Sequence, residues 1–265
     1  MSLNYGGKRL NCHESTHWNN EEVLTIKKPA PSLIQPEVGM QLKLSKTLLS
    51  KKPSSQSVMI GMTSYLVLLL VFIIDNPNMS ANGHQVFVKG QYWKAFTTSL
   101  MHGDFVHLGH NTIFFVTFAV LLNFYFGFWI FPVLSFLVGG LINMIALKFY
   151  GPEVYLVGIS GVIYFMAAFW MTLFVGLERQ MSLYRRLMIA TAVSLILFFP
   201  EVFVKDVSYL AHGLGFGIGI VMGGFYFGIK KEQLRSHEIW TEKMPPNLEL
   251  EEYIDQLENQ GTGAL

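Results

Sequence analysis

The chain has 265 residues, of which 51% are apolar and only 14% are charged, and its formal net charge is +1. This composition excludes an ordinary soluble globular domain, because the charged residues gather in blocks between long neutral runs. The near-neutral net charge gives no reason to expect nucleic acid as a partner. We therefore predict a multi-pass membrane protein.

The first 56 residues are polar and contain no apolar run of the kind found in a signal peptide. Pro29, Pro31, Pro36 and Pro53 would interrupt any long helix in this segment. We therefore predict that residues 1–56 form a cytoplasmic N-terminal tail.

Membrane-spanning helices account for most of the rest of the chain, because such a helix needs about 20 mostly apolar residues. Three runs of suitable length contain no Lys, Arg, Asp or Glu: residues 58–74, 154–177 and 207–229. A fourth run, residues 105–147, is 43 residues long and has room for two helices joined by a turn near residues 123–127. These four runs predict five spans.

A further span is predicted over residues 187–200, which form a shorter apolar run. Arg185 and Arg186 can extend this span by reaching back to the lipid headgroups. The sequence therefore predicts an all-α membrane protein, with a six-transmembrane-helix domain over residues 57–229.

An interfacial loop is predicted between the first and second helices. The segment from Asp75 to Gly103 is too long for a turn and is rich in aromatic and aliphatic residues such as Phe87, Tyr92 and Trp93. Side chains of this kind favour the membrane interface. We expect the segment to lie at the outer surface of the bilayer.

The distribution of basic residues predicts the orientation. Of the nineteen Lys and Arg residues, only Lys89, Lys94, Lys148 and Lys205 fall on one side of the predicted bundle, and the other fifteen fall on the side of both termini. Because basic loops are retained in the cytoplasm, both termini are predicted to be cytoplasmic. Residues 230–265 then form an acidic C-terminal tail. The expected location is a bacterial inner membrane, with an organellar membrane as the alternative.

Polar residues recur near the outer ends of three predicted helices. His107 and Asn111 are four residues apart, so they share one face of the second helix. Ser160 lies in the first turn of the fourth helix, which is expected to begin near Val157, and His212 lies about five residues into the sixth. Taken singly, a serine or histidine in a membrane helix also fits a structural hydrogen bond between helices.

A stripe of small residues on the sixth helix favours contact between these groups. Gly215, Gly219 and Gly223 repeat every four residues, as in closely packed membrane helices. The fourth helix, with Gly161 and Ala168, is the best partner for this stripe. Such packing would bring His212 to Ser160 and supply the base that a serine nucleophile needs.

The chain resembles the rhomboid intramembrane serine proteases in three motifs. These are Tyr92-Trp93-Lys94-x-Phe96-Thr97 followed by His102, His107 and Asn111; Gly158-x-Ser160-Gly161 with Tyr164; and Ala211-His212-x-x-Gly215-x-x-x-Gly219. The resemblance covers roughly residues 57–229.

The resemblance implies an endopeptidase in which Ser160 is the nucleophile and His212 its general base. The backbone N–H of Ser160, with the side chains of His107 and Asn111, would stabilise the oxyanion. Tyr164 would pack against the His212 ring. Supporting positions would be Gly158, Gly161, Gly215 and His102. The implied substrates are single-span or other transmembrane proteins in the lipid bilayer, and no metal or other cofactor is required.

Two positions depart from the family pattern. Lys94 stands where many members have arginine, and Ser208, four residues before His212, stands where many have aspartate. A point charge replaces a fork-shaped donor at the first position. Both changes concern loop geometry and substrate range rather than the Ser160–His212 pair.

Two other functions fit parts of the pattern. One is a non-proteolytic rhomboid-like protein that binds membrane clients. The other is a transporter, or a carrier of metal or haem, that uses His102, His107, His110 and His212. The second reading is less favoured, because no internal repeat appears in the chain.

Overall fold

The computed structural model describes residues 4–5, 8–9, 25–27, 41–198 and 208–243. Residues Leu44–Ile239 form one compact unit, and the described residues of Met1–Lys43 and Trp240–Leu265 belong to a second. Much of the two predicted tails, including residues 10–24 and 244–265, lies outside the described residues.

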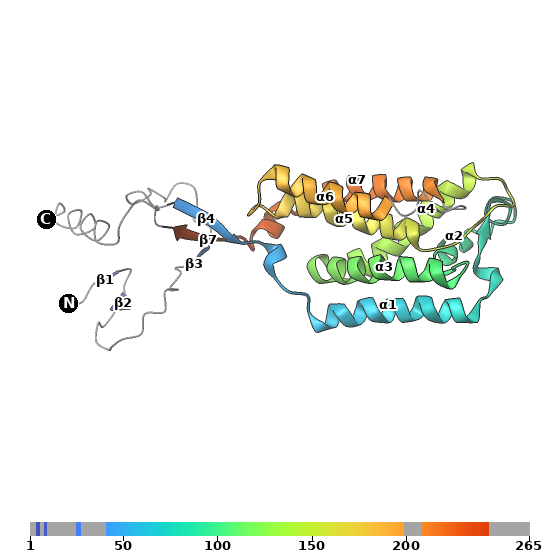
Figure 1. The fold of residues 1–265 in the computed structure, drawn as a ribbon, viewed down its shortest axis with the longest axis horizontal. Helices are drawn as coiled ribbons and strands as arrows, with labels where there is room; N and C mark the ends of the chain where they lie inside the picture. Colours follow the sequence, from blue (N-terminus) through green and yellow to red (C-terminus); the bar gives the residue numbers. More distant parts are fainter. Residues whose placement is uncertain (1–3, 6–7, 10–24, 28–40, 199–207, 244–265) are drawn as a thin grey trace. The chain divides into compact units, whose positions relative to one another are not determined.

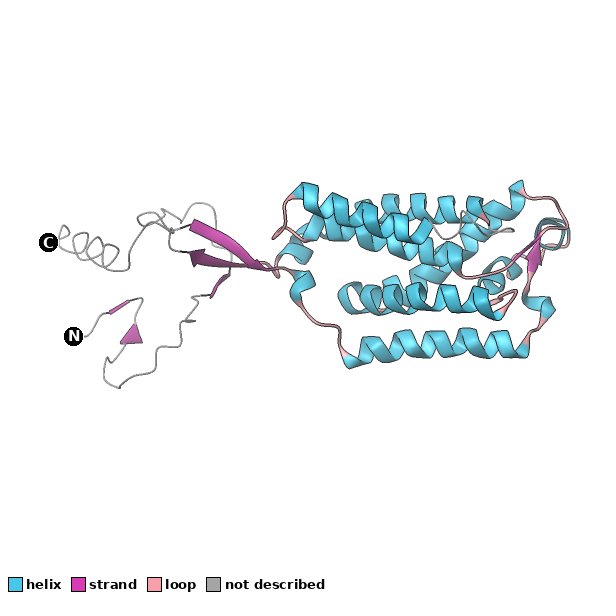
Figure 2. Cartoon of the chain, viewed as in Figure 1, coloured by secondary structure: helices cyan, strands magenta, loops and turns pink. Residues whose placement is uncertain are grey.

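Long helices make up most of the larger unit (Figures 1 and 2). They are α1 (Ser55–Ile74), α3 (Phe105–Phe126), α4 (Ser135–Phe149), α5 (Ser160–Leu177), α6 (Leu183–Phe198) and α7 (Tyr209–Arg235). A short 3-10 helix, η1 (Leu48–Ser50), precedes α1, and a π-helical segment, η5 (Trp129–Leu134), leads into α4. The predicted helical membrane fold is confirmed, although the described residues also include short strands.

Five helical stretches in the described residues are long and apolar enough to cross a membrane, so the chain is a multi-pass integral membrane protein. They are α1, α3, η5 continued by α4 (Trp129–Phe149), α5 and α7. The remaining predicted span corresponds to α6, which has 16 described residues. Residues 199–207, which follow α6, lie outside the described part.

The long neutral run does contain two helices, as predicted. Helix α3 ends at Phe126, and Gly127 follows with φ of +85°, a conformation in which glycine avoids the steric cost of a side chain. The next helical stretch begins at Trp129. The chain therefore turns within the predicted region.

Three predicted helix ends differ from the structure. Helix α5 begins at Ser160, not near Val157, because Tyr155–Leu156 is a strand and Gly158 has φ of +112°. Helix α6 begins at Leu183 and includes both arginines that were expected to flank it, since basic side chains at a membrane surface are compatible with helix. Helix α7 continues to Arg235, beyond the apolar run.

The predicted interfacial loop contains several short elements. They are η2 (Pro77–Met79), β5 (Ala81–Asn82), η3 (His84–Val88), α2 (Lys94–Thr97) and η4 (Thr98–Leu100). Strand β5 pairs antiparallel with β6 (Tyr155–Leu156), placing Ala81 opposite Leu156. This pairing attaches the loop to the segment that leads into α5.

Helix α4 also holds this loop in place, through a hydrogen-bonding asparagine and a close ring contact. The Asn143 side-chain amide donates hydrogen bonds to the Ala95 carbonyl at 2.9 Å and to the Ser99 hydroxyl at 2.8 Å. The Phe96 ring lies directly against Gly140, where a Cβ atom would overlap it. The loop is therefore fixed on two sides.

Helices α5 and α7 pack closely through the predicted glycine stripe. A Cβ atom at Gly215 would overlap the Gly161 carbonyl oxygen, and one at Gly219 would lie 2.5 Å from the Phe165 carbonyl oxygen. At Gly223 the corresponding distance to the Phe169 carbonyl oxygen is 3.0 Å. The predicted pairing of these two helices is confirmed, and only glycine allows the backbones to approach so closely.

Short strands outside the helices were not predicted. Strands β1 (Asn4–Tyr5) and β2 (Lys8–Arg9) pair antiparallel. Strands β3 (Thr25–Lys27), β7 (Ile239–Lys243) and β4 (Gln41–Lys46) form a sheet in that order.

Candidate functional site

Ser160 and His212 meet at the start of helices α5 and α7. The Ser160 Oγ atom lies 2.7 Å from Nε2 of His212, which is hydrogen-bond distance. His212 is 3% exposed, and Ser160 is half-buried. These two side chains are 52 residues apart in the sequence and are brought together by the glycine-mediated contact of the two helices.

Tyr164 packs against the histidine. Its ring stacks on that of His212, with centroids 4.4 Å apart and an angle of 19° between the planes. Its hydroxyl donates a hydrogen bond of 2.8 Å to the carbonyl of Leu197 on α6. One buried tyrosine thus connects α5, α6 and the imidazole of α7.

The backbone around Ser160 presents hydrogen-bond donors. Ser160 is the first residue of α5, and the preceding residue, Ile159, makes no side-chain cap. The first N–H groups of a helix have no partner within the helix. They therefore form a local site for negative charge beside the serine hydroxyl.

His107 and Asn111 lie against Gly158, two residues before Ser160. A Cβ atom at Gly158 would be 2.8 Å from Cε1 of His107 and 4.0 Å from Nδ2 of Asn111. Gly158 has φ of +112° and is buried. Both the conformation and the lack of space explain why glycine occupies this position.

The amide of Asn111 is a buried donor without a hydrogen-bond partner among the described residues. Asn111 is 8% exposed. Leaving such a group unpaired costs free energy, and at functional sites a ligand can provide the missing acceptor. Asn111 is therefore suited to binding a substrate oxygen.

His102 lies beside His107, with ring centroids 5.2 Å apart in an edge-to-face arrangement. Burial and the neighbouring His107 lower the pKa of His102 to about 4, so the ring is neutral at pH 7.

Asp104 caps α3 by accepting a 2.8 Å hydrogen bond from the His107 N–H, and this bond lowers the pKa of the Asp104 carboxyl.

Thr98 joins the interfacial loop to the backbone before Ser160. Its buried hydroxyl donates to the Leu156 carbonyl and accepts a 3.2 Å hydrogen bond from the Ala81 N–H. Its carbonyl accepts a 3.2 Å hydrogen bond from the Gly158 N–H. The sequence analysis did not single out Thr98. A polar run, Thr97-Thr98-Ser99, within an amphipathic loop was the available signal.

The two departures from the family pattern have identifiable surroundings. Ser208 caps α7 by accepting a 3.3 Å hydrogen bond from the Ala211 N–H, and its hydroxyl lies 2.9 Å from that of Tyr150. Lys94 is 5% exposed, with its ammonium 5.7 Å from the centroid of the Trp93 ring. Tyr150 was also missed by sequence reasoning.

His110 is exposed on α3, and the structure does not place it with the Ser160–His212 pair. Within residues 41–198 and 208–243, no group of three or more His, Cys, Asp or Glu side chains is arranged to hold a metal ion.

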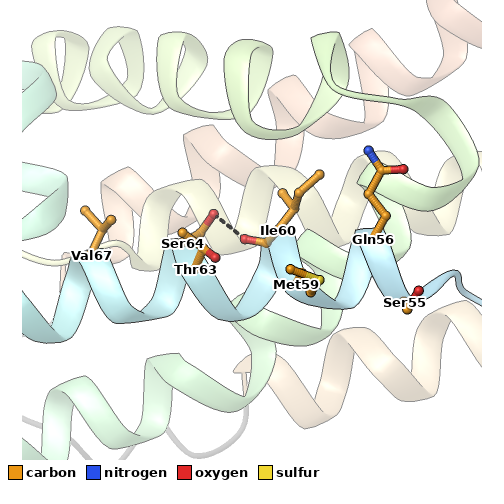
Figure 3. Close-up of a pocket in the computed structure, with 7 residues that line it drawn as sticks. All are labelled: Ser55, Gln56, Met59, Ile60, Thr63, Ser64 and Val67. Carbon is orange, nitrogen blue, oxygen red and sulfur yellow. Dashed lines mark hydrogen bonds between the residues drawn. The ribbon is translucent and has the colours of Figure 1, made fainter.

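Two cavities lie away from Ser160 and His212. A groove of about 430 Å³ runs along α1 (Figure 3), and its lining residues, Ser55, Gln56, Met59, Ile60, Thr63, Ser64 and Val67, all belong to that helix. The Ser64 hydroxyl is occupied by a 2.8 Å hydrogen bond to the Ile60 carbonyl. The second cavity lies at the C-terminal ends of α3 and α7.

A protein-family model described as the rhomboid domain matches residues 89–229 of this chain. No curated protein matched in the comparison. The matched residues include helix α2 and all of α3 to α6, together with most of α7.

Proposed function

Because the chain belongs to the rhomboid family, we propose that it is an intramembrane serine endopeptidase. It hydrolyses peptide bonds in or near the transmembrane segments of other membrane proteins. The observation that carries this proposal is the 2.7 Å separation between Ser160 Oγ and His212 Nε2. A half-buried serine hydroxyl beside a buried imidazole is the minimal arrangement for nucleophilic acyl transfer.

In the proposed reaction, neutral His212 accepts the Ser160 proton on Nε2 while Oγ attacks the scissile carbonyl carbon. The resulting oxyanion receives hydrogen bonds from the Ser160 N–H and the Asn111 amide, assisted by His107. His212 then donates the proton to the leaving amine, which departs and leaves an ester on Ser160. Water, activated by His212, hydrolyses this ester and restores the serine.

The site also constrains the substrate. The carbonyls of a transmembrane helix are bonded within that helix, so a segment must unwind locally before Ser160 can reach one. Substrates with glycine or proline near the cleaved bond are therefore expected, because those residues weaken helices. We further propose that the site opens to the outer side of the membrane, in keeping with the bias of basic residues.

The test uses the purified full chain in detergent, a fluorophosphonate probe and a single-span reporter protein. We expect labelling and cleavage by the wild type. Ser160→Ala and His212→Ala should each reduce turnover on the order of 10⁴-fold or more. Ser64→Ala is the matched control, because this serine lies in the α1 groove and should leave turnover unchanged.

Cleavage by Ser160→Ala at the wild-type rate would refute the proposal. Reporter binding without probe labelling or cleavage by the wild type would instead indicate a non-proteolytic client-binding protein.

A further inference from the structure

A second cavity, at the end of the bundle opposite Ser160, has features of a binding site. Its volume is about 310 Å³, and it lies between η1, the C-terminal end of α3 and the C-terminal half of α7. It is lined by Leu48, Lys51, Phe124, Tyr125, Phe126, Tyr226, Gln233, Leu234 and His237. The cavity involves no residue of the proposed catalytic machinery.

The lining divides into an apolar part and a polar part. Aromatic and aliphatic side chains such as Phe126, Tyr226 and Leu234 form the first, and Lys51, Gln233 and His237 form the second. In the described part of the chain, the side chains of these three polar residues make no hydrogen bond or ion pair with another residue. Among the described residues, nothing therefore occupies these three polar groups.

The wall that carries Lys51 is held in place. The Tyr125 hydroxyl lies 3.1 Å from the Leu49 carbonyl and 2.7 Å from the Lys51 carbonyl, and its single hydrogen is shared between these two acceptors. These bonds fix the segment after η1 against the end of α3. Lys51 is therefore presented by an ordered backbone rather than by a free tail.

The cavity lies at headgroup depth. Helix α7 has 27 residues, which corresponds to about 40 Å at 1.5 Å per residue. The hydrocarbon core of a bilayer is about 30 Å thick. Since α7 begins near the active-site end, its last turns and His237 extend into the polar region of the opposite leaflet.

Among the described residues, the charge around the cavity favours an anion. Exposed basic residues gather at this end of the bundle: Lys52, Arg185, Lys230 and Lys231. Two nearby carboxylates are buried and already have partners, so they do not face a ligand in the cavity: Glu178 accepts a hydrogen bond from Thr47, and Glu238 forms an ion pair with Arg179. Glu232 on α7 is exposed but does not line the cavity.

We propose that this cavity binds the headgroup of an anionic phospholipid. The phosphate lies between Lys51 and His237, and Gln233 donates to a headgroup oxygen. The glycerol backbone and upper acyl chains rest on Phe126, Tyr226 and Leu234. Basic pockets between transmembrane helices bind anionic headgroups in this way. The site is independent of the proposed protease activity.

The test measures phosphatidylglycerol binding to the purified full chain in neutral detergent by native mass spectrometry. We expect one tightly held phosphatidylglycerol, with phosphatidylcholine bound at least about fivefold more weakly. Lys51→Gln should weaken phosphatidylglycerol binding by about fivefold. Lys52→Gln is the matched control, because Lys52 is exposed and next to Lys51 in the sequence but does not line the cavity. The affinity of this variant for phosphatidylglycerol should change by less than about twofold.

Three results would overturn the proposal. Equal losses in both lysine variants would indicate a general surface attraction. Equal binding of phosphatidylcholine and phosphatidylglycerol would show that the cavity does not select a lipid by the net charge of its headgroup. Displacement of the lipid by millimolar inorganic phosphate would identify a site for free phosphate. Thermal unfolding of each variant in the same detergent verifies that the fold is retained.

Discussion

The hydroxyl of Tyr150 lies 2.9 Å from the hydroxyl of Ser208, so the residue that ends α4 is joined to the residue that caps the start of α7. Ser208 also accepts a hydrogen bond from the Ala211 N–H, and its carbonyl accepts one of 3.1 Å from the His212 N–H. We therefore expect this contact to help position the imidazole four residues later.

Tyr150→Phe removes only the hydroxyl of this contact. We expect kcat to fall about three- to tenfold with KM little changed, because small displacements of a catalytic group are costly. Steady-state cleavage of the reporter measures both constants. Tyr184→Phe on α6 is the control, since its side chain is exposed at the other end of the bundle. An unchanged kcat in Tyr150→Phe would show that the contact does not position His212.

Asn111→Ala removes the buried donor beside Gly158. If this amide binds the oxyanion, kcat should fall about 10²- to 10³-fold while KM changes little, because the bond forms mainly in the transition state. The measurement is a full rate-against-substrate curve for both proteins. A rise in KM at constant kcat would assign Asn111 to ground-state binding instead.

Thr98→Val deletes the hydroxyl that holds the strand before Ser160 and nearly preserves side-chain volume. The buried Leu156 carbonyl and Ala81 N–H then lose their partner, which should cost about 1 to 3 kcal/mol of unfolding free energy. Thermal unfolding in detergent measures the change. Thr98→Ser should retain wild-type behaviour.

Thr117→Val, at an exposed position of α3 where the hydroxyl bonds only to its own helix, provides the comparison for Thr98→Val. Similar stability losses in the two valine variants would contradict a special role for Thr98.

Gly215→Ala tests the close approach of α5 and α7. The added methyl would overlap the Gly161 carbonyl oxygen, so we expect a loss of about 1 to 3 kcal/mol in stability and a fall in turnover as His212 moves away from Ser160. Gly217→Ala, two residues away, meets nothing within 4 Å and should be neutral or slightly stabilising. Equal effects in both variants would argue against the close contact.

The pKa of His102 predicts how stability depends on pH. It is lowered from 6.5 to about 4, chiefly by burial, so the folded protein favours the neutral ring. Between these two values the unfolded chain binds more protons than the native state. The contribution of neutral His102 to the free energy of unfolding should therefore be complete above pH 6.5 and should decline as the pH falls towards 4.

Urea or thermal unfolding at several pH values measures this dependence. His102→Gln, which does not titrate, should flatten the decline over the same window. A slope identical to that of the wild type would show that another group is responsible.

Hydropathy alone predicted most of the membrane helices. The neutral run of residues 105–147 was correctly divided near Gly127, because a glycine-containing break in a run of twice the necessary length leaves few alternatives. The ends of α5, α6 and α7 were less accurate. Apolar character marks the part of a helix in lipid, whereas helix ends depend on caps and on strand pairing such as that of β5 with β6.

Composition, charge bias and local spacing by themselves determined that this is a membrane-spanning helical protein, and the glycine repeat of α7 indicated which helix it packs against. These features can be identified from the residue types along the chain, and the glycine repeat from residues one or two helical turns apart. Only the tertiary structure decided that Thr98 holds the strand before Ser160, that Tyr150 meets Ser208, and that a cavity with Lys51 at its edge lies at the opposite end. These contacts join residues far apart in the sequence, and no periodic pattern specifies them, because each depends on how separate helices are aligned along their axes.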